Sequence, residues 1–260
     1  MIFDGRASFE LAWARRGSVV AALSSALCAL LVFWPSFSHG WTNYDDPMFL
    51  LGETGWRGLG PAAWRWALTA RVGSVYQPLA WLSYGLDHAR WGMNPGGYHL
   101  QSALWHALSA MLMFLSARRV LAAARPRLVG EESWGLDAAA LFAALVFAVH
   151  PLRVESVSWA SERRGVLCCA FVLATVWAYL RAREPGRRAG ALAPVFVLLL
   201  LALLSKGMAL LLPVALLALD FYPLRRIGPR GEGVVAAVRE KIPLLALSFI
   251  SGLAGVMSQH

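Results

Sequence analysis

Ionisable residues follow directly after an apolar run in the middle of the chain. The run covers 138–149 and is followed by HPLRVE, which contains His150, Arg153 and Glu155. A second acidic cluster, NYDD at 43–46, follows the first apolar segment and contains Asp45 and Asp46. Ionisable groups where a membrane helix leaves the bilayer are costly to place and usually functional. On one side of a membrane, the two clusters would form a single ionisable site at its surface.

The paired carboxylates have two interpretations that the residues leave open. Asp45 and Asp46 are suited to work as a general base or to hold a divalent cation. They also fit a turn capped by Asn43, with Pro47 preparing the next segment. Because two adjacent aspartates are a short and common pattern, the residues alone favour the turn.

The HPLRVE segment also has a structural interpretation. Pro151 must end the preceding helix and can begin the next one, which places Glu155 in a first turn where negative charge is favourable. That account explains Pro151 and Glu155 but leaves His150 and Arg153 unexplained. A functional and a structural role are therefore equally supported here.

Three basic residues are suited to bind a phosphate. Arg163 and Arg164 follow the HPLRVE segment, and Lys206 lies between two apolar segments. Arginine forms paired hydrogen bonds with phosphate, and lysine acts as a compact positive charge. Contact with anionic lipid head groups is the alternative. His99, near the outer end of its helix, is a further candidate, whereas Asp87 is expected on the surface of a loop helix.

The composition identifies the class of protein that positions these residues. Of the 260 residues, 58% are hydrophobic and 15% are charged, and the mean hydropathy is +0.54. Apolar stretches near the ~20 residues that cross a bilayer as a helix recur along the chain. They cover 17–37, 98–121, 136–149, 166–180, 191–204, 208–221 and 242–257. The sequence therefore predicts an all-α, polytopic helical membrane protein with about seven transmembrane helices.

The net charge of +9 does not indicate a nucleic-acid partner. The basic residues lie in short clusters between apolar segments, as topology signals do, and no nucleic-acid-binding motif is present. The three cysteines lie inside apolar segments and show neither a disulfide framework nor metal-ligand spacing.

Basic residues also predict the orientation. With the N-terminus in the cytoplasm, 16 of the 24 lysines and arginines fall on the inner side. Arginine far outnumbers lysine, which is typical of GC-rich bacteria, so we expect a multi-pass protein of the cell inner membrane. The loop 38–97, the turn at 150–164 and Lys206 then share the outer face, with Lys206 in a tight hairpin.

The loop 38–97 is rich in aromatic residues and holds six of the twelve tryptophans. Aromatic side chains with a polar edge favour the bilayer interface. Pro61 and Pro78 can each open a helix at its first position. We therefore expect a long outer loop with two interfacial helices, the second covering 79–90.

Several segments together resemble a known family. They are YDD at 44–46, YQPLAWLSY at 76–84, WGMNPGGYHL at 91–100, HPLRVESV at 150–157, SK at 205–206 and LDFYPL at 219–224. This ordered set is similar to bacterial relatives of the transmembrane and tetratricopeptide-repeat O-mannosyltransferases, in the type C glycosyltransferase superfamily. The resemblance covers nearly the whole chain.

The resemblance implies a membrane glycosyltransferase. It would move a sugar, with inversion, from a polyprenyl-phosphate donor to a hydroxyl of an acceptor protein or glycan at the outer face. Asp45 or Asp46 would be the general base, and His150 and Glu155 would line the site. Candidates for binding the substrate or its phosphate are Arg163, Arg164, Lys206, Tyr76 and His99.

The chain departs from the family pattern in two ways. Relatives continue with further membrane helices and tetratricopeptide repeats, so we expect one domain over 1–260 that is incomplete at its C-terminus. Many relatives have an acidic residue after the Ser-Lys pair, where this chain has Gly207. No cofactor is indicated beyond the divalent cation left open above. The alternative function is a non-catalytic, truncated membrane scaffold that binds lipid or partner proteins.

Overall fold

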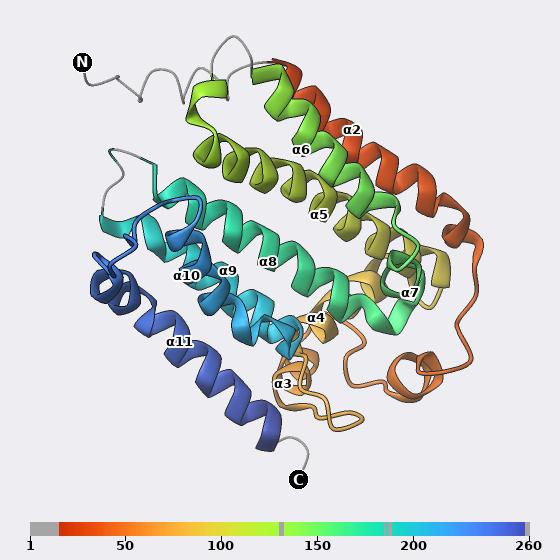
Figure 1. Cartoon of the computed structure of the whole chain (residues 1–260). Coiled ribbons are helices and arrows are strands. Elements are labelled where there is room, and N and C mark those ends of the chain that lie inside the picture. Colours follow the sequence, from red (N-terminus) through yellow and green to blue (C-terminus); the bar gives the residue numbers. More distant parts are fainter. Residues whose placement is uncertain (1–15, 130–132, 185, 187–188, 258–260) are drawn as a thin grey trace.

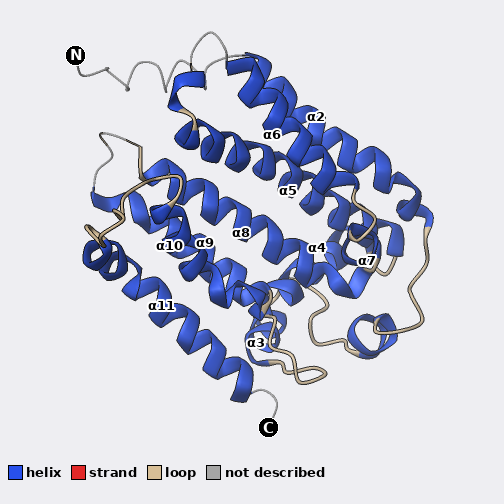
Figure 2. Ribbon diagram, in the orientation of Figure 1, coloured by secondary structure: helices blue, strands red, loops and turns tan. Residues whose placement is uncertain are grey.

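The computed structural model describes residues 16–129, 133–184, 186 and 189–257, which fold as a helical bundle (Figures 1 and 2). The longer helices are α2 (Arg16–Phe33), α5 (Pro95–Ala124), α6 (Ser133–Val149), α8 (Arg163–Ala182), α9 (Ala193–Ser205), α10 (Leu212–Phe221) and α11 (Val234–Met257). The shorter ones are η1 (Trp34–Ser38), η2 (Pro47–Gly52), α3 (Pro61–Thr69), α4 (Pro78–Trp91), η3 (Pro126–Leu128), α7 (Arg153–Ser158), η4 (Ala160–Glu162), η5 (Ala189–Leu192) and η6 (Gly207–Leu211). The prediction of an all-α fold is confirmed.

Three of the described helical segments are long and apolar enough to cross a membrane. They are Gly17–Ser38, Pro95–Ala124 and Ala160–Ala182. Shorter apolar helices cover Ser133–Val149, Ala193–Ser205 and Gly207–Phe221. Each predicted apolar segment therefore contains a helix, and the chain is a helical membrane protein.

One predicted boundary is wrong by two turns. The last helix was expected from 242, but α11 begins at Val234 and continues through Pro243. The charged residues before Pro243 interrupt the apolar pattern, yet the helix accommodates Glu240 and Lys241 because both have partners. Glu240 pairs with Arg183 at 2.9 Å, and Lys241 pairs with Asp220.

Alanines hold α2, α5 and α6 close together. Buried alanines from all three helices pack against one another, and they are Ala22, Ala29, Ala107, Ala110, Ala140, Ala144 and Ala148. Small side chains let membrane helices approach closely. The ring of His106 contributes a hydrogen-bonding contact of 2.9 Å between its Nε2 and the Ala148 carbonyl oxygen. Larger residues such as Leu199 and Leu216 fill the second core, among α8, α9, α10 and α11.

The chain reverses at Lys206, as the predicted hairpin requires. Lys206 has an extended backbone (φ −160°, ψ 139°), so α9 ends there. Its side chain reaches Glu162 at the start of α8, whereas Asp220 at the end of α10 accepts a hydrogen bond from Tyr179 near the end of α8. Helices α9 and α10 therefore run in opposite directions along α8 (Figure 1).

The segments that carry the candidate residues gather at one end of the bundle (Figure 1). This site end holds 38–95, 150–162 and 206–211, where α2, α6 and α9 finish and α5, α8 and α10 begin. The opposite, distal end holds 124–129 and 221–234.

Four of the basic residues that predicted the orientation, Arg6, Arg15, Arg187 and Arg188, lie outside the described residues.

The structure of the loop 38–97 agrees with the predicted helix starts but not with the predicted position of all its tryptophans. Helices α3 and α4 do begin at Pro61 and Pro78. However, Trp56 and Trp81 are buried inside the protein instead of facing a bilayer interface. Their rings each lie 5.8 Å from that of Tyr84, in a cluster that is continuous with α5. Trp56, Trp81 and Tyr84 therefore belong to a core that fixes the loop on the bundle, whereas Trp64 and Trp91 are exposed.

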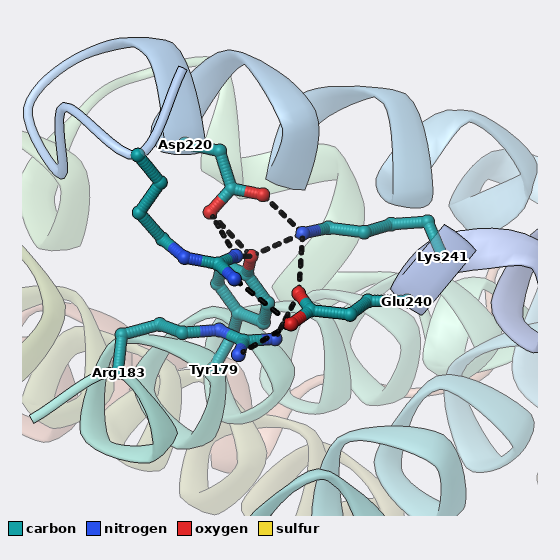
Figure 3. Close-up of polar contacts among 6 residues, drawn as sticks. Tyr179, Arg183, Asp220, Glu240 and Lys241 are labelled. Atoms are coloured by element: carbon teal, nitrogen blue, oxygen red, sulfur yellow. Dashed lines mark hydrogen bonds and ion pairs between the residues drawn. The ribbon is translucent and has the colours of Figure 1, made fainter. Parts of the chain in front are cut away.

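A buried polar network joins α8, α10 and α11 at the distal end (Figure 3). Asp220 receives hydrogen bonds from the Tyr179 hydroxyl at 2.6 Å and from Arg226 at 2.9 Å, and it pairs with Lys241. Asp220, Tyr179 and Lys241 are fully buried. Removal of Asp220 would leave buried Lys241 only its longer contact with Glu240, at 3.7 Å, so this network is a strong constraint on how the three helices pack.

Candidate functional site

Asp46 connects the first loop to the start of α8. Its side chain is fully buried. One carboxylate oxygen accepts the Ser161 backbone N–H at 3.0 Å, and the other accepts the Thr42 backbone N–H at 2.8 Å. The turn at 43–45 is present, but the cap comes from Asp46 and not from Asn43 as expected. Asp46 therefore fixes the position of its neighbour Asp45.

Asp45 is the more exposed member of the acidic pair. It is half-buried, and no hydrogen bond or ion pair joins its side chain to any residue that the structure describes. Tyr44 on its other side packs against Trp159, with ring centroids 5.5 Å apart. A carboxylate held in place by its neighbours but free itself is suited to accept a proton.

Glu162 forms a charge cluster with two predicted phosphate contacts. It follows Ser161, so the Asp46 hydrogen bond places it close to the acidic pair. Its carboxylate pairs with Arg164 at 3.0 Å and with Lys206. Arg164 also reaches the Gln77 side chain at 3.5 Å. Sequence analysis missed Glu162, and its position beside two basic residues was the signal that could have found it.

Arg163 is a buried connector between helices. Its guanidinium pairs with Asp87 at 2.7 Å and donates to the Tyr98 carbonyl at 2.6 Å and the Ser102 hydroxyl at 2.9 Å. It also lies over the Tyr84 ring, 5.3 Å from the centroid. These contacts direct Arg163 into the protein, unlike Arg164 and Lys206, which are partly exposed.

The surface position expected for Asp87 is wrong. Asp87 is buried on the inner face of α4, because that helix turns its aromatic side and not its leucines toward the bundle. Burial raises the pKa of Asp87 above its ordinary value, and the Arg163 guanidinium opposes that rise. The pair therefore links α4 of the first loop to α8.

Replacement of Asp87 by alanine should destabilise the protein strongly. Arg163 would keep its buried charge without a carboxylate, and such a loss costs about 3–5 kcal/mol. We expect a large drop in the midpoint of thermal unfolding in detergent. Glu53→Ala is the control, since Glu53 is a half-buried acid of the same loop with no side-chain partner in the described chain. Equal midpoints for the two variants would contradict the role given to Asp87.

His150 and Glu155 lie at the same end of the bundle but outside this cluster. Both are exposed. His150 Nδ1 accepts the Leu152 backbone N–H at 3.2 Å, and Glu155 lies in the first turn of α7. Among the described residues, neither forms a hydrogen bond or an ion pair with the acidic pair or with the Glu162 cluster. This position of Glu155 agrees with the structural role predicted from the sequence, a negative charge in the first turn of a helix.

The two remaining predicted residues hold the loop in different places. His99 is fully buried, and its Nε2 lies 3.2 Å from the Gly40 carbonyl oxygen. Tyr76 donates to the Leu68 carbonyl at 3.2 Å and lines a pocket of about 300 Å³ with Arg71 and Ala254. His99 therefore positions the chain leading to the acidic pair, and Tyr76 faces a separate pocket.

The residues described do not assemble a metal-ligand set. No three histidine, cysteine, aspartate or glutamate side chains in the described ranges lie close enough to share an ion. Both Asp46 oxygens already accept backbone N–H groups, which leaves Asp45 as the free carboxylate of the pair. The described residues therefore do not provide a set of ligands for the divalent cation that the sequence left open.

Known proteins provide an independent comparison. No family model matches the chain, and no solved structure matches it. Protein O-mannosyl-transferase TMTC2 of Homo sapiens is 30% identical over 171 residues, which cover 63% of this chain and 19% of that protein. The Tmtc1 protein O-mannosyl-transferase of Drosophila melanogaster is 33% identical over 135 residues, or 52% of this chain and 14% of that protein.

The similarity extends to a further member of the same group. Protein O-mannosyl-transferase TMTC4 of Homo sapiens is 29% identical over 126 residues, or 48% of this chain and 17% of that protein. The matched part thus spans less than a fifth of each of these three relatives. Over the matched residues, this helical membrane protein is a distant relative of the protein O-mannosyl-transferases.

Proposed function

We propose that the protein is a membrane glycosyltransferase that moves a sugar from a polyprenyl-phosphate donor to an acceptor hydroxyl. The observation that carries the proposal is the hydrogen bond from Ser161 to Asp46. It joins the turn that carries Asp45 to the segment that carries Glu162, whose carboxylate pairs with Arg164 and Lys206. A base beside cations is the arrangement that sugar transfer away from a phosphate needs.

Asp45 is the general base of this proposal. The acceptor hydroxyl oxygen attacks the anomeric carbon of the sugar, and its proton passes to the Asp45 carboxylate. The bond between that carbon and the phosphate oxygen breaks, and the polyprenyl phosphate leaves with the electron pair. Attack opposite to the leaving group inverts the anomeric configuration. Asp46 holds the base in place without taking part in proton transfer.

Arg164 and Lys206 stabilise the leaving phosphate. The two cations share one carboxylate, that of Glu162, so the cluster keeps a net positive charge. Gly207 follows Lys206 at the position where many relatives have an acidic residue. In this chain Glu162, from a different helix, contacts Lys206. Positive charge fixed where negative charge develops lowers the barrier to transfer.

The location follows from the same proposal. The site end would face the outer side of the inner membrane, with the N-terminus in the cytoplasm and 1–260 acting as one membrane domain. Its partners would be the lipid-linked sugar, membrane lipid and an acceptor protein or glycan. The non-catalytic scaffold remains the competing function, and it predicts that charges at the site end tolerate neutralisation.

Neutralisation of Lys206 distinguishes these functions. We expect Lys206→Met to lower sugar transfer about 100-fold, the size of effect known for loss of one group that stabilises developing negative charge. The matched control is Arg65→Gln, which removes an exposed charge from α3 of the same loop. Transfer is measured in membrane vesicles with radiolabelled polyprenyl-phosphate hexose. Equal rates in the two variants would contradict the assignment of Lys206, and a wild type without transfer would favour the scaffold.

A further inference from the structure

A basic pocket lies at the distal end, away from the proposed site. Its volume is about 450 Å³. It is lined by Ala124, Arg125, Pro126, Arg127, Leu128 and Arg225. The first five residues follow or end α5, and Arg225 follows α10, so the pocket forms where two separate parts of the bundle meet. A pocket of this size can accept a small polar group together with part of an apolar chain.

The arginines of this pocket carry charge that the described protein does not neutralise. Arg125, Arg127 and Arg225 are exposed, and no ion pair joins any of them to a described residue. The acidic side chains described at this end have other contacts: Asp137 with Arg118, Glu184 with Arg119, Asp220 with Arg226, Glu240 with Arg183, and Glu232 with the Arg230 backbone N–H. Among the residues that the structure describes, the pocket therefore concentrates positive charge.

The surroundings of the pocket suit the edge of a bilayer. Phe221 ends α10 and Tyr222 follows it, just before Arg225, and they are 60% and 53% exposed. Trp134, at the start of α6, is 73% exposed at the same end. Exposed aromatic residues at the ends of membrane helices mark the interface between head groups and acyl chains. A ligand there would meet charge on one side and apolar surface on the other.

We infer that this pocket binds the phosphate of an anionic membrane lipid, with Arg125, Arg127 and Arg225 as its cationic contacts. Basic pockets between membrane helices recognise lipid head groups through this combination of charge and interface position. Apolar lining from Leu128 and Pro126 favours a phosphate that carries an acyl chain over a free phosphate ion. The inference does not depend on the proposed sugar transfer, because the pocket lies at the other end of the bundle.

Native mass spectrometry of the full chain tests this inference. The protein is released from micelles that contain equal amounts of phosphatidylglycerol and phosphatidylcholine, and retained lipids are counted. We expect preferential retention of phosphatidylglycerol by the wild type, and a loss of about tenfold or more in R127Q/R225Q. The control R230Q/R239Q removes the same charge from exposed positions of the same end that do not line the pocket, and it should match the wild type.

Three outcomes would overturn the inference. Equal losses in both double variants would indicate a general surface charge effect, and equal retention of the two lipids would show no anionic site. Displacement of phosphatidylglycerol by an excess of inorganic phosphate would indicate a free phosphate ligand. Thermal unfolding of both double variants checks folding, and the single variant R127Q repeats the test if R127Q/R225Q is destabilised.

Discussion

Asp45→Asn should reduce sugar transfer by about 10²–10⁴-fold, the contribution expected of a general base. Asparagine keeps the size of the side chain but cannot take the proton of the acceptor hydroxyl. Because the Asp45 side chain forms no hydrogen bond with the described protein, folding and membrane insertion should be unchanged. Transfer rates at matched protein levels in membrane vesicles measure this effect.

Two further variants separate the base from the residue that positions it. Glu53→Gln, in the same loop, removes a half-buried carboxylate with no assigned role and should keep the wild-type rate. Asp46→Asn should lower both activity and the midpoint of thermal unfolding, because an amide cannot accept both backbone N–H groups that now bind Asp46. Full activity in Asp45→Asn together with lost activity and unchanged stability in Asp46→Asn would reverse the two assignments.

Asp220→Ala should cause a large loss of stability. It removes the carboxylate that Lys241, Arg226 and Tyr179 share in the distal network (Figure 3). Lys241 is fully buried and would keep only its longer contact with Glu240, at 3.7 Å, and loss of the close partner of a buried charge costs about 3–5 kcal/mol. A much lower midpoint of thermal unfolding in detergent is the expected result.

The double variant D220L/K241M tests whether the loss comes from the buried Lys241 charge that Asp220 no longer balances. Replacement of both members of a buried pair by apolar side chains is often neutral, so the midpoint should recover in part. Glu232→Ala is the control, since Glu232 is an exposed acid of the same end that accepts a hydrogen bond from the Arg230 backbone N–H. A midpoint for Asp220→Ala equal to that of Glu232→Ala would show that the network does not stabilise the bundle.

Most of the helices could be predicted because apolar length and proline position are local signals. Pro61, Pro78 and Lys206 mark a helix start or break in the sequence and do so in the structure. The start of α11 could not be predicted in this way. Its charged first half is stabilised by Asp220, Arg183 and Arg226, which are distant in sequence.

The site was less predictable, because burial and pairing depend on residues far along the chain. The predicted topology places Asp45, Asp46, Arg164 and Lys206 at one end of the bundle, and the contacts of Asp46 and Glu162 join the segments that carry them. It could not show which aspartate is free, since the partner of Asp46 is a backbone N–H 115 positions away. It also could not show that Asp87 is buried, because Arg163 supplies its charge partner from another helix.

The most direct test of the central claim is sugar transfer by the wild-type chain itself. The 260-residue protein is placed in vesicles with radiolabelled polyprenyl-phosphate hexose and candidate protein and glycan acceptors, and Asp45→Asn provides the background. The account predicts that label moves from the lipid to an acceptor in the wild type and stays on the lipid in Asp45→Asn. Label that remains on the lipid equally in both proteins, for every hexose and acceptor supplied, would contradict it.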